Sequence, residues 1–297
     1  MNRPRGGPQA NYRTRSTLLT LPYLLGALFL VGLPLLISLV LAFFAYDGLS
    51  PPVWAGWNNF REALGEPFFR VAVVNSLTFV YLAVPLRLLA ALGLALLLSR
   101  PRRGSGLYRA AVYLPTVVPE IAYALLWLWI LNPLYGPLNQ LLRAVGLPAP
   151  AWLVEQQTAL PALVMMSLFT IGEGFVILLA ALKAIPVEIY EAAWVDGGSR
   201  WQVFRYLTLP FLQPWLILLL FRDVILTFQT TFTPAYIMTG GGPYYATLFL
   251  PLLIFEEAFD RLRFGIGSAM LLMMILITFG LLLLLYGIFQ GWGYEEE

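Results

Sequence analysis

The stretch that decides the fold covers residues 185–210 and reads IPVEIYEAAWVDGGSRWQVFRYLTLP. Pro186 suits the first turn of a helix, because its missing N–H would have no partner there. We expect this helix to run from about Pro186 to Asp196. Gly197 and Gly198 follow it, and glycine accepts the left-handed conformation that ends many helices. The first half of the stretch therefore predicts a short helix closed by a tight glycine turn.

The second half of the stretch predicts another helix that continues into an apolar block. Ser199 is followed three residues later by Gln202, which is the pattern of a capping box. A short helix, a glycine turn and a second helix would form a rigid hairpin that carries apolar residues. Such a surface usually meets a partner. The alternative is an amphipathic hairpin that lies on the inner leaflet of a membrane.

The composition of the whole chain excludes a water-soluble enzyme. Hydrophobic residues make up 60% of the 297 residues and charged residues 11%, against roughly 45–50% and about 25% in soluble domains. A disordered chain is excluded too, because apolar content is high and net charge is small. The net charge of +2 is too weak to indicate nucleic-acid binding. The composition points toward transport across a membrane.

The residues that most enzymes rely on are missing from the sequence. It holds no Cys and no His, which removes disulfides, zinc–thiolate sites and hydrolytic triads built on Ser-His or Cys-His. We therefore expect no catalytic residue, no metal and no cofactor. There is also no Gly-x-x-x-x-Gly-Lys-Ser/Thr phosphate loop, so any ATP hydrolysis must occur on a partner.

Six apolar blocks are each long enough to cross a membrane as a helix. They cover residues 18–44, 71–98, 108–131, 160–182, 207–230 and 267–290. The sequence thus predicts an all-α membrane protein with one six-helix transmembrane domain over residues 18–290. Prolines inside the blocks predict kinks rather than breaks; they are Pro34, Pro85, Pro115 and Pro119.

The distribution of Lys and Arg predicts the orientation in the membrane. Most of them fall in the segments that are inside if the N-terminus is cytoplasmic, with a tight cluster over residues 100–109. We expect a disordered basic tail over residues 1–17, a cytoplasmic loop over 185–206 and an acidic cytoplasmic end over 291–297. Both termini are then cytoplasmic.

Five ionisable residues fall inside the apolar blocks: Arg87, Glu120, Glu173, Arg222 and Asp223. A charge at the centre of a bilayer costs about 2.5–3.5 kcal/mol on insertion scales, so such residues usually face a bundle interior or a wet cavity. The sequence leaves two roles open for them. They form ion pairs that fix helix packing, or they line a substrate path.

The hairpin stretch also resembles a known family. Its spacing resembles the EAA motif of membrane subunits of bacterial binding-protein-dependent ABC importers, with Leu207 where the motif usually has Ile. The matching residues are Glu191, Ala192, Ala193, Gly197, Leu207, Leu209 and Pro210. The resemblance implies that Glu191, Ala192, Ala193, Asp196 and Gly197 contact an ATPase subunit and couple its motion to the membrane helices.

Other stretches resemble the carbohydrate-uptake branch of that family, which includes maltose and glycerol-phosphate permeases. They are Asn75-Ser76-Leu77, Leu114-Pro115, residues 136–142, residues 239–243 with Thr247, and residues 265–269. The resemblance implies a type I importer permease in the bacterial cytoplasmic membrane, surrounded by lipid. It also implies a second homologous permease, two ATPase subunits, an external solute-binding protein and a sugar substrate.

Within this branch the resemblance places the sugar site at mid-membrane on the fourth to sixth spans. Glu173, between two glycines, is the best candidate for the substrate path. The other candidates are Phe169, Arg222, Asp223, Gln229 and Thr231. Three alternatives stay open: the same machinery for glycerol phosphate, a polyol or another non-sugar solute; an ion-coupled secondary transporter; and, remotely, an intramembrane enzyme.

Overall fold

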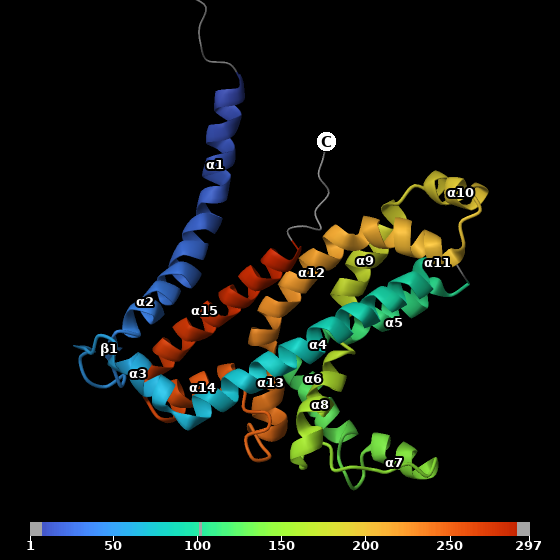
Figure 1. Cartoon of the computed structure of the whole chain (residues 1–297). Helices are drawn as coiled ribbons and strands as arrows, with labels where there is room; N and C mark the ends of the chain where they lie inside the picture. Colours follow the sequence, from blue (N-terminus) through green and yellow to red (C-terminus); the bar gives the residue numbers. More distant parts are fainter. Residues whose placement is uncertain (1–7, 101–102, 290–297) are drawn as a thin grey trace, which may run out of the picture. The chain divides into compact units, whose positions relative to one another are not determined.

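A computed structural model of the chain describes residues 8–100 and 103–289. These residues are predominantly helical, with four π-helical segments (η1–η4) and one antiparallel pair of short strands, β1 (Phe44–Ala45) and β2 (Val53–Trp54) (Figure 1). They divide into two compact units. The first unit comprises the described residues up to Ala63 together with Glu256–Leu272, and the second comprises Leu64–Phe255 and the described residues from Met273 onward.

The first unit is built from a long N-terminal helix, the strand pair and the start of the last helix. Its elements are α1 (Pro8–Ala27), η1 (Leu28–Gly32), α2 (Leu33–Leu41), β1, β2, most of α3 (Asn58–Gly65), η4 (Glu256–Asp260) and the first part of α15 (Phe264–Phe289). The predicted tail over residues 1–17 is helical from Pro8 onward, and residues 1–7 lie outside the described part. Proline is well tolerated at a helix start, where it lacks only an N–H that would be unpaired.

Buried polar groups hold the first unit together. The amide of Asn59, which is buried, donates to the carbonyls of Ala42 and Phe44 at 2.9 Å each. Glu257 is fully buried and lies 3.3 Å from the guanidinium of Arg263. Each of these groups joins segments far apart in the sequence or across a turn, so they fix the local path of the chain.

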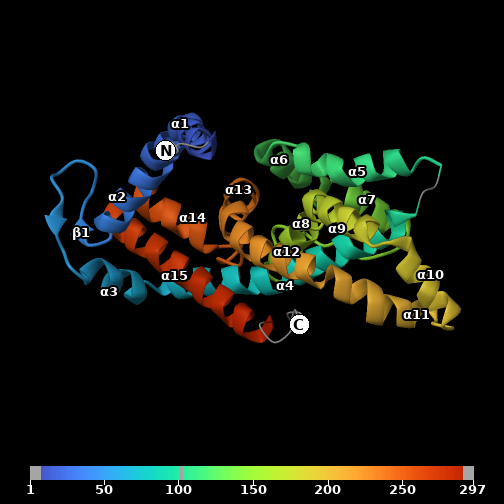
Figure 2. The same ribbon diagram turned by 90° about the horizontal axis from the view of Figure 1, so that it is seen from above.

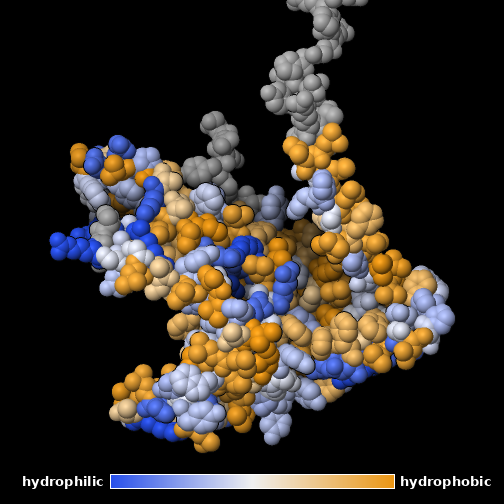
Figure 3. Space-filling model, turned by 180° about the vertical axis from the view of Figure 1, so that it is seen from behind, coloured by the Kyte–Doolittle hydropathy of each residue, from blue (hydrophilic) through white to orange (hydrophobic). Residues whose placement is uncertain are grey.

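The first of the four long apolar helices in the described part of the chain is the least buried of them. The stretch Leu18–Leu41 is long and apolar enough to span a membrane, yet none of its most apolar window is buried within the chain. Figure 3 shows hydrophobic side chains over its surface. Lipid solvates such a surface without penalty, so the segment needs no neighbour in its own chain.

The second unit carries the remaining helices around α4. Its elements are α4 (Pro67–Ser99), α5 (Ser105–Val117), α6 (Glu120–Ile130), α7 (Pro137–Ala144), α8 (Gln156–Ser167), α9 (Gly172–Ala184), α10 (Val187–Val195), α11 (Arg200–Val203), η2 (Phe204–Thr208), α12 (Leu209–Thr230), α13 (Phe232–Pro234), η3 (Ala235–Thr239), α14 (Leu250–Phe255) and the rest of α15. Helix α4 contacts α5, α8, α9, α12 and α14. It is therefore the central helix of this unit.

Small residues on α4 let the core of this unit close tightly. Ala91 and Ala95 are buried against Phe175 and Leu178 of α9 and Leu219 of α12. Alanine leaves room for the larger side chains of the facing helices, which gives the interdigitated packing expected of a protein interior.

Two of the six predicted spans are bent helix pairs. Four helices of the described part are long and apolar enough to cross a membrane, and the number rises to six if each bent pair is one span. The pair α5–α6 is bent by 103° and the pair α8–α9 by 44°. The fifth span is longer than predicted and covers Arg200–Thr239.

The kink predicted at Pro119 is wrong, because the chain breaks there, whereas Pro115 lies inside α5. Val118 is extended, with ψ 131°, and Pro119 precedes the first residue of α6. The ring of a proline disfavours the helical conformation of the residue before it. Pro85, in contrast, lies within the continuous helix α4. Pro119 thus lies at a helix break, whereas Pro85 does not interrupt its helix.

Candidate functional site

A cavity of about 260 Å³ lies among α4, α5, α6, α8, α9 and α12 in the second unit. Both helix breaks border it, since its lining includes Val118 from the first break and Thr170 and Ile171 from the second. Non-helical backbone at membrane depth is tolerated where it is buried in protein or lines a water-filled cavity. The position of the breaks is therefore explained by the cavity beside them.

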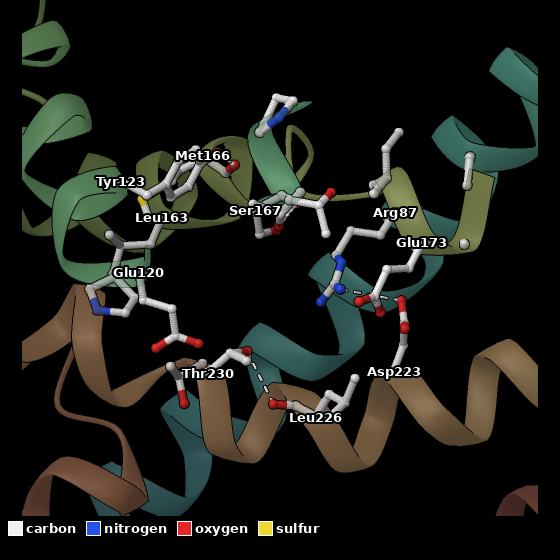
Figure 4. Close-up of a pocket in the computed structure, with 18 of the residues that line it drawn as sticks. Arg87, Glu120, Tyr123, Leu163, Met166, Ser167, Glu173, Asp223, Leu226 and Thr230 are labelled. Carbon is white, nitrogen blue, oxygen red and sulfur yellow. Dashed lines mark hydrogen bonds and ion pairs between the residues drawn. The ribbon is translucent and has the colours of Figure 1, made fainter. Parts of the chain in front are cut away.

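Four of the charged residues identified in the sequence form one network in this cavity. Asp223 lies 3.5 Å from Arg87 and 3.2 Å from Arg222, measured between carboxylate oxygens and guanidinium nitrogens. Arg222 also pairs with Glu173. Figure 4 shows Arg87, Glu173 and Asp223 together on one side of the cavity. The ion pairs that the sequence predicted as one alternative are thus formed, and the residues that form them also line the cavity.

The fifth charged residue, Glu120, lies on the other side of the cavity (Figure 4). It is the first residue of α6, and its carboxylate accepts a hydrogen bond of 2.9 Å from the hydroxyl of Thr233. Among the described residues no Arg or Lys forms an ion pair with it. The positive end of the helix dipole favours a carboxylate at this position.

Two buried polar atoms on the cavity wall have no hydrogen-bond partner among the described residues. They are Nε of Arg87 and the hydroxyl oxygen of Thr231. Leaving a buried polar group unpaired costs about 1–3 kcal/mol. Thr231 was a weaker candidate for the substrate path, and the structure places it in the cavity lining.

Two other candidates lie outside the cavity lining. Phe169 is 53% exposed and packs against Trp127, with 5.0 Å between ring centroids. Gln229 is exposed on α12. The cavity instead includes Tyr123 and Ser167, which the sequence analysis missed. Tyr123 donates to the carbonyl of Met166 at 2.8 Å, and a lone tyrosine or serine in an apolar block gives no signal that would single it out.

The hairpin predicted from residues 185–210 is confirmed. Helix α10 ends before Gly197, which has a positive φ of 81°. Ser199 then caps α11: its hydroxyl accepts from the N–H of Gln202 at 3.3 Å, and its own N–H donates to the side chain of Gln202 at 2.8 Å. The helix continues through η2 into α12. Figure 2 shows α10 and α11 at one end of α12.

The hairpin presents its motif residues on the surface. Glu191, Ala192, Asp196 and Gly197 are exposed, and Ala193 is half-buried. No residue of α10 is buried. A hydrogen bond of 3.2 Å between the hydroxyls of Tyr190 and Thr208 braces α10 against η2. The hairpin is therefore a braced element with an exposed face.

Two of the other sequence motifs meet in the structure. The amide of Asn75, on α4, donates to the carbonyls of Tyr245 and Leu248 at 2.7 and 3.1 Å. The neighbouring hydroxyl of Ser76 accepts from the N–H of Leu250 at 2.9 Å. The loop that follows the Thr239–Pro243 motif is thus fixed to α4.

Comparisons with known proteins identify the class. The model of the family described as "binding-protein-dependent transport system inner membrane component" matches residues 83–292. The probable ABC transporter permease protein YesP of Bacillus subtilis (strain 168) is 36% identical and covers 93% of this chain and 90% of its own length. The trehalose/maltose transport system permease protein MalF of Thermococcus litoralis is 33% identical, over 80% of this chain and 81% of its own.

A solved structure shows the same fold. A chain of the bacterial ABC transporter involved in the import of the acidic polysaccharide alginate superposes with a TM-score of 0.81 at 22% identity, covering 94% of this chain and 96% of that one. The class is therefore a membrane permease of the ABC transporters with the type I importer fold. The chain belongs to the binding-protein-dependent inner membrane component family, as a multi-pass transport component rather than an enzyme.

Proposed function

We propose that this chain is the permease subunit of an ATP-driven importer and that it passes a sugar through its cavity by alternating access. The observation that carries the proposal is the cavity at the two helix breaks, in a chain of the permease family. Carboxylates, hydroxyls and an unpaired guanidinium N–H line it, and such groups bind sugar hydroxyls. The trehalose/maltose relative and the alginate transporter support a sugar. Glycerol phosphate or a polyol is the alternative.

The importer contains further subunits in this proposal. A second, homologous permease completes the membrane part, two ATPase subunits bind on the cytoplasmic side, and an external binding protein delivers the solute. The chain itself has no phosphate loop, so its partners hydrolyse the ATP. Both termini and the hairpin lie on the cytoplasmic side of the inner membrane.

The hairpin is the contact with the ATPase. Exposed Glu191 accepts hydrogen bonds or pairs with a basic group of the partner, and Ala192 and Ala193 allow close approach. Asp196 and Gly197 form the turn between the helices. Closure of the ATPase dimer moves this braced element, and α11, η2 and α12 carry the motion to the cavity, where α12 holds Arg222 and Asp223.

A pair of glycine variants tests this contact. Gly197 and Gly146 have nearly the same backbone, with φ of 81° and 76°, and a Cβ at either position meets nothing within 4 Å. Valine costs about 1–2 kcal/mol in this conformation. We expect Gly197→Val, like Glu191→Lys, to insert normally but to lose the ATPase on purification or to uncouple uptake in proteoliposomes. Gly146→Val should retain the ATPase on purification and keep uptake coupled to ATP hydrolysis.

The opposite result would remove the hairpin from the mechanism. If Gly197→Val and Glu191→Lys both retain the ATPase and transport at the wild-type rate, the hairpin is not the coupling element. The membrane-surface interpretation of residues 185–206 would then replace it.

A further inference from the structure

We infer that this cavity selects uncharged sugars over anionic ones, and that Glu120 is a specificity-determining residue for this selection. The inference rests on the proposed function and narrows its substrate class. Membership of the family leaves the question open, because the trehalose/maltose relative and the acidic-polysaccharide transporter differ in the charge of what they are named for. The inference that this chain prefers neutral sugars comes from the charges in its own cavity.

Among the residues that the structure describes, the cavity offers an anion no unpaired cation. Its charged lining consists of Arg87, Arg222, Glu120, Glu173 and Asp223, which is two positive charges against three negative ones. Both arginines pair with carboxylates: Arg87 with Asp223 at 3.5 Å, and Arg222 with Asp223 and Glu173. A phosphate or carboxylate would have to displace one of these pairs to obtain a salt bridge. It would also meet the remaining negative charge of Glu120.

The two helix starts at the cavity are already occupied by the chain's own carboxylates. A helix N-terminus carries a partial positive charge and favours an anion. Helix α6 starts at Glu120, and Glu173 lies in the first turn of α9. Both side chains line the cavity. The places where an anionic ligand would gain most from the backbone therefore hold glutamates instead.

The groups that remain unpaired suit a neutral polyhydroxyl compound. Nε of Arg87 and the hydroxyl of Thr231 are buried, line the cavity and lack a partner among the described residues. Glu120 is exposed, and within the described part of the chain its side chain has one hydrogen bond, from Thr233, so its carboxylate can accept more bonds. A sugar hydroxyl both donates and accepts. It can therefore pair with the N–H of Arg87, the hydroxyl of Thr231 and the carboxylate of Glu120, which all belong to residues that line the cavity.

Uptake by the complete importer in proteoliposomes tests the inference. The probes are maltose, trehalose and N-acetylglucosamine as neutral sugars, with glucuronate and glycerol 3-phosphate as anions. The affinities of the isolated binding protein for the same probes are measured in parallel. Dividing the uptake ratio by the affinity ratio leaves the contribution of the membrane part. We expect this contribution to favour neutral over anionic probes at least tenfold in the wild type.

The variant Glu120→Gln should shift that preference about tenfold toward anions, because it removes one negative charge and leaves the start of α6 without a carboxylate. Glu120→Asp keeps the charge and should keep the preference. Yield and co-purification of the partner subunits check that both variants assemble.

Each result tests either the inference that the cavity selects against anions or the proposed function as a sugar permease. Equal passage of glucuronate or glycerol 3-phosphate and neutral sugars by the wild type would overturn the inference. So would an unchanged preference in an assembled Glu120→Gln importer. Transport of a non-sugar solute with uptake of none of the sugars would instead refute the proposed function.

Discussion

Gly172 gives the sharpest test of how the second helix break is held. It is the first residue of α9, is buried, and donates its N–H to the hydroxyl of Thr116 at 3.1 Å. A Cβ at this position would lie 2.4 Å from that hydroxyl oxygen and 2.9 Å from Cα of Tyr113. Because the second contact is with backbone, a side-chain rotation cannot relieve it. Gly172→Ala must therefore push α5 and α9 apart.

The size of the effect follows from these contacts. Overpacking of this kind costs about 1–3 kcal/mol, and loss of the hydrogen bond to Thr116 adds about 0.5–1.5 kcal/mol. Alanine favours the helix over glycine by up to about 1 kcal/mol, which offsets part of this cost. Gly174 is the matched control, because a Cβ there meets Ala91 and Leu219 only at 3.7–3.9 Å. Gly174→Ala keeps the gain in propensity without the clash.

Thermal unfolding of the two purified variants in the same detergent measures the difference. We expect Gly172→Ala to be less stable than Gly174→Ala by about 2–4 kcal/mol, and each kcal/mol shifts Tm by about 2–4 °C in a domain of this size. Uptake should fall as well, since Glu173 follows directly on α9. Equal Tm values for the two variants would show that α5 and α9 do not make this close contact in the purified protein.

Two further predictions concern the charges and the topology. Asp223 is shared by two arginines and its side chain is 7% exposed, so Asp223→Asn leaves Arg87 buried without its counter-ion and should cost about 3–5 kcal/mol of stability. Glu173 is 49% exposed, so Glu173→Gln should cost at most about 1 kcal/mol while reducing uptake with ATPase activity and assembly intact; equal melting temperatures for the two variants would contradict this difference. The chain has no Cys, so a single Cys at Val195, which is 88% exposed on the hairpin, should resist a membrane-impermeant thiol reagent in intact cells, whereas a Cys at Leu134 should react. Labelling at Val195 from outside would reverse the predicted orientation.

Local signals made the hairpin predictable. Gly197, Ser199 and Gln202 act within a few residues of one another, and their turn and capping chemistry does not depend on the rest of the fold. The apolar blocks were predictable for a similar reason, because each must cross the membrane by itself.

The site was less predictable, because its geometry depends on how separate helices are rotated and bent. The sequence shows that Arg87 and Asp223 both lie in apolar blocks, but only the packing of α4 on α12 brings them together. The break at Pro119 depends on the direction of α6 as well as on the proline ring. Phe169 and Gln229 were chosen by residue type, and their exposure follows from where the packing leaves them: Phe169 lies in the break between α8 and α9, and Gln229 on the exposed side of α12.

The exposed first span, Leu18–Leu41, has a consequence for how such chains diverge. A residue that is not buried within its own chain is constrained there mainly by the need to be apolar, so one aliphatic side chain can replace another with little loss of intramolecular packing. Gly172, in contrast, admits no larger residue. The first span should therefore accumulate conservative substitutions faster than the α5–α9 interface, which lies within the residues 83–292 that the family model matches.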